Sequence, residues 1–368
     1  MKICFLADAA SLHSKRWIEY FAKKGYEIYW VSLTKNYFGD IEGVKFYRLL
    51  KSGFKPLDIL LNVMPLIILL KKIKPDILHV HYAGVNGVLG ALSGFHPFIL
   101  TVYGSDILVV PKKRLIKSAM KFVLKKTDLI TCNGKTLRDR MIKFETDPRK
   151  IKFIYWGTDL QKFKRSPKNK GILKKLNIFG SSVVISLRNF ETVYNIETLI
   201  KAIPLVIKEI PQVKFIIVGK GSQETKIKNL AQSLNVLKYI RFTGWLSEDM
   251  VCQYLNLADI YVSTSLSDGD LSQSTQQAMA CEVPIITTDL YVNKNRIKNG
   301  ENGIIFPQKC PELLAQKIVM LLQDKELRSK LGKEGRKTVE NHFDFNKEIE
   351  KAENIYEDLV KSKYDTLS

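Results

Sequence analysis

Short apolar runs alternate with longer stretches of helical periodicity along almost the whole chain. The apolar runs predict strands over residues 2–7, 27–33, 44–48, 76–82, 97–102, 128–132 and 151–155, and then over 183–187, 213–218, 239–243, 259–263, 283–287 and 303–306. The intervening stretches predict helices that include 12–24, 57–72, 113–126, 195–209, 222–234, 248–257 and 274–281, and consecutive helices from 310 to about 362. Strands that alternate with helices form parallel sheets covered on both faces, so the predicted fold class is α/β.

The polar stretch QKFKRSPKNKGILKK, at 161–175, separates the two series of strands, and we expect the hinge between two doubly wound, Rossmann-like domains there. We predict an N-terminal domain over 1–165, a C-terminal domain over 166–345, and a C-terminal helix over 346–368 that packs back toward the N-terminal domain. Ligands of such sheets bind where the carboxyl ends of strands meet helix N-termini. The cleft between the two facing domains is therefore the expected site.

The charge of the chain is concentrated in its first half. The whole chain carries a formal net charge of +21. Residues 1–165 hold 30 Lys and Arg against 13 Asp and Glu, and residues 166–368 hold 28 against 24. The run 111–126 is basic without an acid, and helical spacing places Arg114, Lys117, Lys121 and Lys125 on one stripe. Such a stripe is typical of a solvated helix face or of contact with an anionic membrane, whereas no motif supports nucleic acid.

The most apolar stretch, ILLNVMPLIILL at 59–70, is too short to cross a bilayer, which takes about 20 apolar residues. It predicts a buried core helix, or an interfacial helix, because Lys71, Lys72 and Lys74 follow directly. The N-terminal MKICFLADAA predicts a first strand rather than a signal peptide. Five widely spaced cysteines indicate reduced thiols and no zinc site. We therefore expect a cytoplasmic protein, with a peripheral position on the inner face of the cell membrane as an alternative.

A set of short segments, taken in order and with their spacing, resembles glycosyltransferase family 4, whose members are retaining enzymes of the two-domain GT-B fold. The N-terminal segments are DAASLHSKRWIEYFAKKGYE (8–27), PDILHVHY (75–82), PFILTVYGSDIL (97–108), DLITCNGKTLRDRM (128–141) and KIKFIYWGTDLQKF (150–163). The C-terminal segments are SLRNFETVYNIETLIKAI (186–203), VKFIIVGKGSQ (213–223), IRFTGWLS (240–247), NLADIYVSTSLSDG (256–269), AMACEVPIITTD (278–289) and NGENGIIF (299–306). The resemblance implies metal-independent transfer of a sugar, without a cofactor, from a nucleotide-diphosphate sugar to a glycan or lipid-linked glycan.

The resemblance assigns the donor diphosphate to Arg188, whose guanidinium is permanently charged and can bind two oxygens at once. Tyr194 stands where the family usually has a lysine, and it can donate a hydrogen bond but supplies no charge. The turn VGKGSQET, with Gly219 and Gly221, follows a strand and opens a helix, so its amides could cradle a phosphate or simply form a tight turn. Leu246 and the backbone near Gly244 would face the nucleobase.

The segment SLSDGDLSQSTQQAMACEVPIITTD, at 265–289, corresponds to the family's E-x7-E region, which holds the donor sugar and the ribose. Gln277 takes the place of the ribose-binding glutamate, and a neutral amide accepts a hydroxyl less strongly than a carboxylate does. The first glutamate of the E-x7-E pattern would lie eight residues before Gln277, at position 269, where this chain has Gly269. Asp268 and Asp270 lie on either side of it, and we interpret Asp270 as an inserted residue. The loop amides that could bind the sugar or phosphate belong to Gly269, Ser272, Gln273, Ser274 and their neighbours. The structural alternative is a helix start capped by Ser272 or Ser274.

The acceptor side is assigned to the N-terminal domain. Tyr103 stands where many relatives have a histidine close to the transferred sugar, and Asp106 either orients the acceptor or caps the next helix. With Arg188, these two residues are the catalytic candidates. His13 and Arg16 follow the first strand and could contact phosphate or acceptor, while His81 is an acceptor candidate or a satisfied histidine at a strand end.

Two other functions remain open from the sequence. Gln277, Tyr194 and the bulky Tyr291 and Val292, which replace a Gly-Gly pair, suit a binding protein that kept the fold and lost the chemistry. A non-hydrolysing sugar-nucleotide epimerase would need an acid/base pair at the sugar, and no convincing pair is present.

Overall fold

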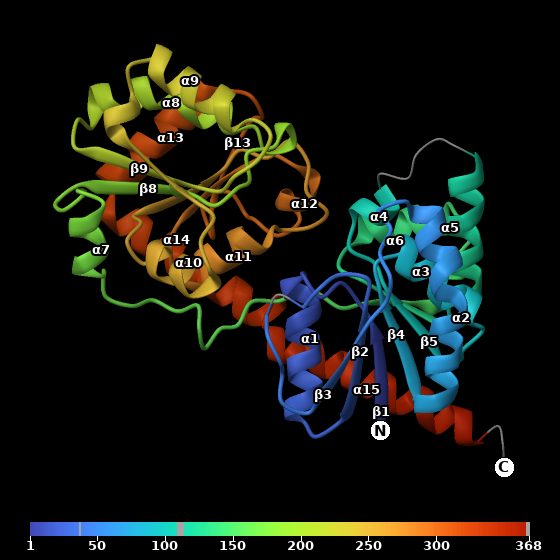
Figure 1. Ribbon diagram of the computed structural model, residues 1–368. Coiled ribbons are helices and arrows are strands. Elements are labelled where there is room, and N and C mark those ends of the chain that lie inside the picture. The colour runs from blue at the N-terminus through green and yellow to red at the C-terminus, as the bar shows by residue number, and fades with distance from the viewer. Residues whose placement is uncertain (37, 109–113, 366–368) are drawn as a thin grey trace. The chain divides into compact units, whose positions relative to one another are not determined.

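The computed structural model describes residues 1–36, 38–108 and 114–365 and divides into two compact units (Figure 1). The first unit contains Met1–Trp156 and Lys347–Ser368, and the second contains Gly157–Asn346. Each unit is a parallel α/β sheet with helices on both faces. The predicted fold class, two doubly wound Rossmann-like domains, is confirmed.

The sheet of the first unit has the strand order β3-β2-β1-β4-β5-β6-β7. Its strands are β1 (Lys2–Leu6), β2 (Glu27–Ser32), β3 (Val44–Arg48), β4 (Ile77–His81), β5 (Phe98–Thr101), β6 (Leu129–Cys132) and β7 (Ile151–Phe153). All of the pairs are parallel, and Phe5 of β1 lies in register with Trp30 of β2 and His79 of β4. Most of the residues of β1, β2, β4, β5 and β6 are buried, as expected for strands covered on both faces.

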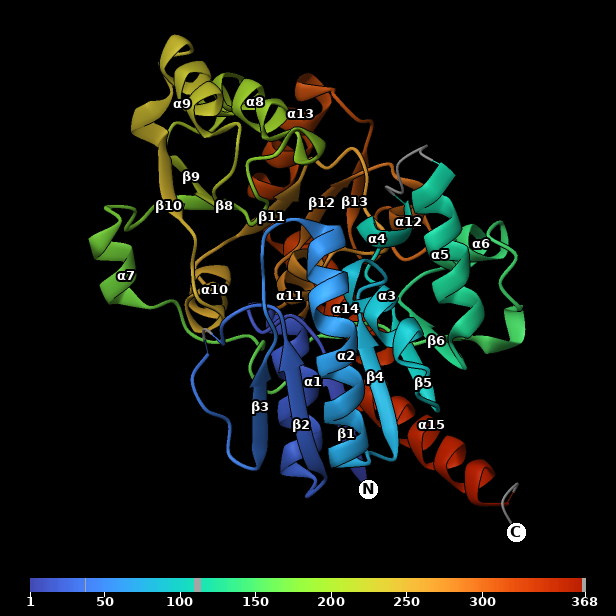
Figure 2. The same cartoon turned by 45° about the vertical axis from the view of Figure 1, so that its right-hand side comes forward.

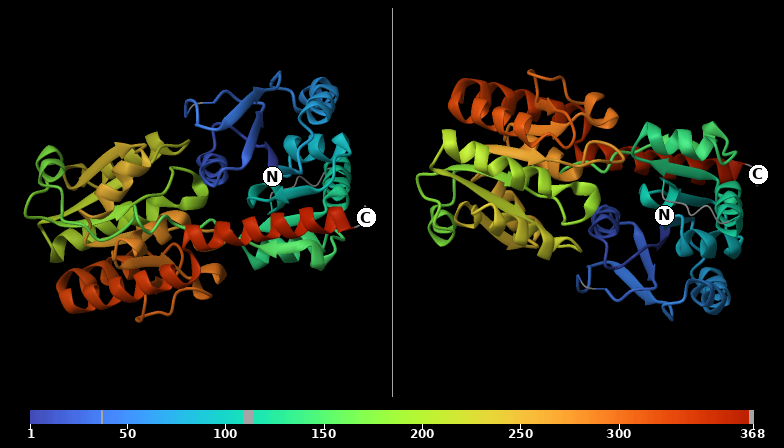
Figure 3. Two further views of the ribbon diagram at one scale, coloured as in Figure 1. Left: turned by 90° about the horizontal axis from the view of Figure 1, so that it is seen from below. Right: turned by 90° about the horizontal axis from the view of Figure 1, so that it is seen from above.

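Helices cover both faces of this sheet (Figure 2). They are α1 (Leu12–Lys23), α2 (Lys55–Ile73), α3 (Val85–Ser93), α4 (Ser105–Leu108), α5 (Arg114–Lys126), α6 (Lys135–Ile142) and α15 (Phe345–Asp365). The helices α2, α3 and α5 share one hydrophobic cluster with Leu78 and Val80 of β4. On the other face, Tyr356 of α15 stacks on Phe21 of α1 and hydrogen-bonds His79 of β4. Figure 3 shows α15 running along this face.

The sheet of the second unit has the strand order β10-β9-β8-β11-β12-β13, and all of its pairs are parallel. Its strands are β8 (Ser182–Ser186), β9 (Val213–Val218), β10 (Ile240–Gly244), β11 (Ile260–Ser263), β12 (Ile285–Thr288) and β13 (Ile304–Phe306). Its helices are α7 (Lys170–Lys175), α8 (Ile196–Glu209), α9 (Glu224–Ser233), α10 (Glu248–Leu255), α11 (Gln273–Ala280), α12 (Tyr291–Lys294), α13 (Pro311–Gln323) and α14 (Lys325–His342). The helices α8 and α13 pack side by side over one face, and α11 packs against α14.

The boundary between the units lies nine residues earlier than the predicted one, between Trp156 and Gly157 instead of after Arg165. The segment after Trp156 belongs to the second unit because Arg336 of α14 donates from Nη1 to the carbonyl of Phe163, over 2.7 Å, and Phe163 is fully buried. The polar stretch 161–175 is likewise packed rather than a free linker. It contains α7, whose N-cap Asn169 accepts a hydrogen bond from the amide of Ile172.

Helix α5 begins at Arg114, so residues 111–113 of the basic run and the predicted helix start at 113 lie outside the described residues. Within the described part of the chain, we find no helix whose length and apolar character would suffice to cross a bilayer.

Candidate functional site

The order of the strands reverses once in each sheet, and the predicted site residues follow the strands at these two points. In the first unit the reversal lies between β1 and β4, and in the second unit it lies between β8 and β11. Loops diverge at such a switch point and leave a crevice at the carboxyl ends of the strands, where ligands of doubly wound sheets bind. We describe the two switch points separately.

Arg188 is the centre of the second unit's switch point, just beyond the end of β8. Its side chain is buried, with an exposed fraction of 8%. It donates from Nη2 to Oδ1 of Asp268, over 2.5 Å, and from Nη1 to Oγ of Ser274, over 3.3 Å. Its Cζ lies 4.3 Å from the centroid of the Tyr194 ring. The structure therefore brings together four of the residues that the sequence assigned to the donor.

Backbone contacts between the loops explain why these four side chains converge. The amide of Leu266 donates to the carbonyl of Val193, over 2.8 Å, and Thr264 Oγ1 donates to the carbonyl of Tyr194, over 2.9 Å. The end of β12 joins them, because Thr288 Oγ1 donates to the carbonyl of Ser265, over 2.6 Å. The loops after β8 and β11 and the end of β12 thus form one hydrogen-bonded unit.

The start of α11 is fixed by its own polar side chains. Ser272 is the N-cap, and its Oγ accepts from the amide of Thr275, over 3.4 Å, as one of the two predicted caps. Gln276 donates from Nε2 to the carbonyl of Leu271, over 2.7 Å, so it holds the preceding loop. Of the Gln-Gln pair, this leaves the buried Gln277 for the ribose role that the resemblance implies. Gln273 Nε2 is buried without a hydrogen-bond partner among the described residues.

The charges at this switch point are largely removed from water. Burial alone would lower the pKa of Arg188, but Asp268, Tyr261 and Tyr194 together outweigh burial, and the pKa is raised. Burial raises the pKa of Asp268, although Arg188 opposes the shift. Burial also raises the pKa of Asp270 to about 6. Desolvated groups of this kind interact more strongly with a charged ligand than groups in water do.

Asp268 and Asp270 form an Asp-x-Asp sequence, which could in principle hold a divalent cation. Their carboxylates instead face different arginines, because Asp268 pairs with Arg188 and Asp270 lies 3.8 Å from Nε of Arg296. Among the described residues, no three His, Cys, Asp or Glu side chains are grouped so that they could hold a metal ion.

The turn after β9 is explained by close backbone packing. A Cβ on Gly219 would lie 2.6 Å from the carbonyl oxygen of Arg188, and a Cβ on Gly221 would lie 2.5 Å from that of Phe190. The amide of Gly219 donates to the carbonyl of Gly244, and the amide of Ser222 donates to Oε1 of Glu191, each over 2.9 Å. Two of the amides that the sequence offered to a phosphate are therefore already engaged, and the tight turn explains both glycines; phosphate binding by the rest of the turn stays a prediction.

The first unit's switch point is built from aromatic rings. The hydroxyl of Tyr103 hydrogen-bonds Nδ1 of His81, over 2.8 Å. The Tyr103 ring centroid lies 4.5 Å from that of Trp156, and the His13 ring lies 4.6 Å from Trp156. The structure therefore brings together Tyr103, His81 and His13. Arg16, on the same helix as His13, is close enough to contribute to lowering the pKa of that histidine.

Burial keeps the histidines of this ring cluster neutral. Burial, with a smaller effect of Arg16, lowers the pKa of His13 to about 4. Burial, with a smaller effect of His13, lowers the pKa of His81 to about 3. Burial also raises the pKa of Tyr103. Nε2 of His81 is buried and has no hydrogen-bond partner among the described residues. The rings of this cluster are therefore uncharged at neutral pH and offer polar atoms, while the charges of Arg16 and Asp106 lie beside them.

Asp106 caps backbone amides. Its Oδ1 accepts from the amides of Tyr103, over 3.0 Å, and Gly104, over 2.8 Å, and its Oδ2 accepts from the amide of Ala83, over 2.9 Å. Of the two roles that the sequence left open, these contacts correspond to capping. The carboxylate positions the loop that carries Tyr103, and its predicted catalytic role is not supported by its surroundings.

Two family models cover most of the chain. One, glycosyl transferases group 1, matches residues 169–338, and the other, glycosyl transferase 4-like, matches residues 2–134. The chain belongs to the group 1, family 4 type of glycosyltransferases.

Individual proteins similar to this chain are also named as glycosyltransferases. An uncharacterized glycosyltransferase of Methanocaldococcus jannaschii is 27% identical over 66% of this chain and 62% of the relative's length. The UDP-Gal:α-D-GlcNAc-diphosphoundecaprenol α-1,3-galactosyltransferase of Escherichia coli is 28% identical over 80% of this chain and 78% of its own. Among solved structures, Anabaena HepE in complex with UDP has a TM-score of 0.79 at 18% identity, covering 98% of this chain and 100% of that one.

Sequence reasoning missed several residues at the switch points of the glycosyltransferase. Trp156 packs against the rings of His13 and Tyr103 in tilted arrangements, and Tyr261 of β11 hydrogen-bonds Ser274, over 2.9 Å. Lys220 is exposed beside Gly244, at the carboxyl end of β10, and supplies a cation. Trp245 follows with 72% of its surface exposed, whereas its neighbour Leu246, which was assigned to the base, is partly buried. The sequence TGWLS places this tryptophan directly after a predicted strand, and that position could have identified it as a site residue.

The expected loop at Tyr291 and Val292 is a helical turn. Tyr291–Lys294 forms α12, and none of its residues has a positive φ. The bulky side chains therefore fit without strain, because this loop has a backbone that does not require glycine.

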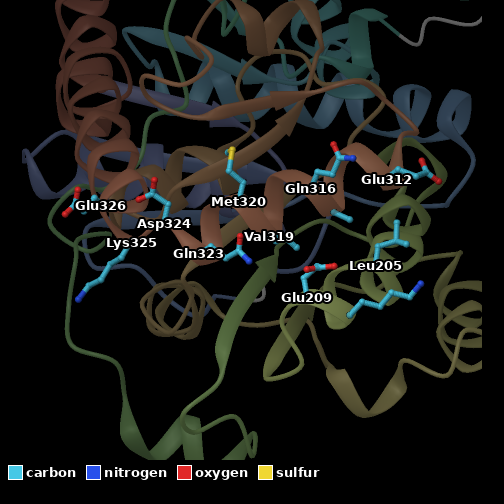
Figure 4. A pocket seen from close by; sticks show the side chains of 12 residues that line it. Leu205, Glu209, Glu312, Gln316, Val319, Met320, Gln323, Asp324, Lys325 and Glu326 are labelled. Carbon is cyan, nitrogen blue, oxygen red and sulfur yellow. The ribbon is translucent and has the colours of Figure 1, made fainter.

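The second unit also has a groove between α8 and α13 (Figure 4). Leu205 and Glu209 of α8 face Gln316, Val319 and Met320 of α13 across it. None of its lining residues follows the carboxyl end of a strand, so it is separate from the switch point that holds Arg188.

Proposed function

We propose that this glycosyltransferase moves a sugar from a nucleoside diphosphate donor to a hydroxyl of a glycan or lipid-linked glycan, with retention at the anomeric carbon and without a metal ion. The observation that carries the proposal is the buried Arg188 at the switch point of the second sheet, beside the N-terminus of α11. A desolvated guanidinium at this position suits a diphosphate, because it can bind two phosphate oxygens in the plane of its fork.

The proposed reaction breaks the bond between the anomeric carbon and the diphosphate oxygen, and the bonding electron pair leaves with the diphosphate. The acceptor hydroxyl oxygen bonds to the same face of the anomeric carbon, and its proton passes to the departing phosphate oxygen. Negative charge therefore develops on the diphosphate as the sugar departs. Arg188 lowers the energy of that charge, and we assign it the main catalytic contribution.

Lys220 would take part of the role of the lysine that Tyr194 replaces. It is exposed and lies on the loop whose carbonyl accepts a hydrogen bond from Phe190, two residues after Arg188. Tyr194 would then hold Arg188 through the ring contact rather than bind phosphate itself. Two cations that could neutralise the diphosphate support a metal-independent reaction, which unchanged turnover in EDTA would test.

The acceptor is proposed to bind at the ring cluster of the first unit. Tyr103, Trp156 and His13 are each partly exposed and would pack on the apolar faces of a sugar, and the neutral histidines offer hydrogen bonds without charge. The E. coli relative is named for an acceptor carried on diphosphoundecaprenol. A lipid-linked acceptor is therefore the first class to test on this chain.

Thermal unfolding with UDP, GDP, ADP and CMP tests the donor site. A nucleotide at about 100 times its Kd stabilises the native state by roughly 2.7 kcal/mol, which shifts a melting curve visibly. We expect one nucleotide to raise the Tm of the wild type and to have no such effect on Arg188→Ala. The double variant Arg188→Ala/Asp268→Ala is required as well, since it avoids leaving the Asp268 carboxylate buried without a partner.

Arg241→Ala is the matched control for these variants. Arg241 lies on β10 of the same sheet and donates to the carbonyl of Leu176, over 2.6 Å, so its loss should lower the basal Tm and preserve the nucleotide shift. If no nucleotide shifts the wild type, the donor assignment is wrong.

A binding protein without turnover is the second candidate. The observation that favours it is the ion pair between Arg188 and Asp268, because the arginine's charge is already partly neutralised and Tyr194 supplies no replacement. Nucleotide binding without release of nucleotide in the presence of sugar donors and lipid-linked acceptors would support this candidate over the transferase.

A further inference from the structure

Helix α2 of the first unit has polar side chains inside and apolar side chains outside. Asn62 is fully buried and Asp58 is 5% exposed, whereas Leu60 is 75% exposed, Met64 60% and Ile68 61%. A helix on the surface of a soluble domain normally has the reverse arrangement. The sequence favoured a buried core helix here over an interfacial helix, and that expectation is wrong, because α2 lies at the surface of its unit with an apolar outer face.

The loop before α2 fixes this rotation of the helix. Asn62 accepts from the amide of Leu50 with Oδ1, over 3.0 Å, and donates from Nδ2 to the carbonyl of Leu50, over 2.8 Å. Asp58 Oδ1 accepts from the amide and the hydroxyl of Ser52, over 2.5 and 2.8 Å. Turning the helix to bury Leu60 would break these hydrogen bonds. The orientation is therefore specified by the sequence and is not a consequence of weak packing.

The exposed side chains form one stripe along α2, whose ribbon lies in the foreground of Figure 2. They recur at intervals of three or four residues, which places them on a single face of a helix. The stripe consists of Leu57 (39% exposed), Leu60, Leu61 (40%), Met64 and Ile68, and Phe54 (65%) lies just before it. Contiguous apolar surface of this kind on a soluble protein marks an interaction site.

Cations flank the stripe at both ends. Lys51 and Lys55 are exposed near its start, and Lys71, Lys72 and Lys74 are exposed at its end. The one acid of α2, Asp58, is turned inward. Helix α5, joined to α2 through α3, adds Leu115, which is 85% exposed, and the exposed cations Arg114, Lys117 and Lys125. An apolar stripe bordered by cations, on a helix whose single acid is buried, is complementary to an anionic bilayer.

We propose that α2 binds anionic membranes with this stripe in the acyl boundary and the flanking lysines at the lipid headgroups. A second copy of the chain fits the same face less well. A two-fold dimer would bring identical cationic borders toward each other, and each copy of residues 1–165 carries 30 basic against 13 acidic side chains. The proposal stands apart from the donor site, because a protein that cannot bind a nucleotide would still bind vesicles through α2.

Vesicle flotation with Leu60→Ser/Met64→Ser/Ile68→Ser tests the proposal. We expect the wild type to float with vesicles of phosphatidylglycerol and phosphatidylcholine, and the triple variant to bind roughly tenfold or more weakly, since partitioning scales with the apolar area buried. All three side chains are exposed, so the triple variant should keep the wild-type Tm and its nucleotide-induced shift.

Phe179→Ser/Leu237→Ser is the matched control, because these side chains of the second unit are 71% and 43% exposed and lie outside the stripe. It should bind vesicles as the wild type does. Lys71→Gln/Lys72→Gln/Lys74→Gln should lose affinity for the anionic vesicles and weaken the salt dependence of binding. The fluorescence emission of the tryptophan in a Leu60→Trp variant should shift to shorter wavelength when anionic vesicles are added. The emission of the tryptophan in a Phe179→Trp variant should not shift.

Two results would overturn the proposal. One is equal vesicle binding by the wild type and the serine triple variant. The other is a wild type that ignores vesicles but sediments as a dimer, with the triple variant monomeric, which would make the stripe an interface between copies.

Discussion

The two switch points of this glycosyltransferase share a topology and differ in chemistry. Beyond β8 and β11, the second sheet places a buried arginine between a carboxylate, a serine and a tyrosine ring. Beyond β1, β4 and β5, the first sheet places neutral histidines and aromatic rings that carry no charge at neutral pH. The sheets supply equivalent crevices, and the loops decide what each crevice can bind. Charge occurs where a diphosphate would lie, and rings occur where a sugar acceptor would lie.

Removing the charge of the second switch point should have the largest effect. We expect Arg188→Ala/Asp268→Ala to lower kcat/KM by about 10²- to 10³-fold, because the departing diphosphate loses a preorganised charge. Arg188→Lys keeps the charge but not the two-pronged geometry and should lie between the double variant and the wild type. Initial rates with saturating acceptor would measure this, and a decrease of less than tenfold would assign the main catalytic contribution elsewhere.

The two switch points should also respond oppositely to acid. His13 and His81 have pKa values lowered to about 4 and about 3, so below pH 6.5 the unfolded state binds more protons than the folded state. As the pH is lowered, the free energy of unfolding of the first unit should therefore decrease, by up to about 1.4 kcal/mol per pH unit for each histidine. Asp270, whose pKa is raised to about 6, has the opposite sign, and its contribution stabilises the second unit as pH falls from about 6 toward 4.

Hydrogen exchange, followed by mass spectrometry and corrected for the intrinsic rate at each pH, separates the two units in the intact chain. Protection of β1 and β4 should decline before that of β8 and β11 between pH 6.5 and 4. His81→Asn should flatten the decline in the first unit. Equal pH dependence in both units would contradict the assignment of neutral buried histidines.

Much of this contrast was predictable from the sequence, and the exceptions have physical reasons. Apolar runs predicted the strands, because a strand covered on both faces must be apolar throughout. Arg188 was assigned through the family resemblance, and its position directly after such a run favoured a functional role. The partners of Arg188 were harder to predict, since Asp268 and Ser274 reach it only after the loops of two strands and the end of a third are hydrogen-bonded together. Asp106 and Gly219 were ambiguous because a carboxylate or an amide serves a ligand and a neighbouring backbone equally well. The apolar outer face of α2 could not be predicted from the hydrophobic pattern either, because Asn62 and Asp58 set the rotation of the helix through hydrogen bonds to the preceding loop.

Tyr103→Phe sharpens the comparison from the acceptor side. It keeps the ring stack on Trp156 and removes the hydrogen bond to His81, which leaves Nδ1 of a buried histidine without this partner. We expect kcat/KM for the acceptor to fall by about tenfold, with the Kd for nucleotide unchanged. Steady-state kinetics and nucleotide titration of the same preparation separate the two quantities. An equal loss in both would mean that Tyr103 does not act on the acceptor side alone.

Asp268→Asn should have the smallest effect and the opposite direction. In the ligand-free protein Asp268 occupies Nη2 of Arg188, so a diphosphate that binds this arginine must displace it. With a neutral amide at 268 the displacement costs less, and we expect the Kd for the preferred nucleotide to fall by about threefold to tenfold, equivalent to roughly 0.7–1.4 kcal/mol. Calorimetric titration measures this, with Asp270→Asn as the control in the same loop, because its carboxylate faces Arg296 instead. A weaker Kd in Asp268→Asn would mean that the carboxylate orients Arg188 for the donor rather than competing with it, and the second switch point would then need both charges to work.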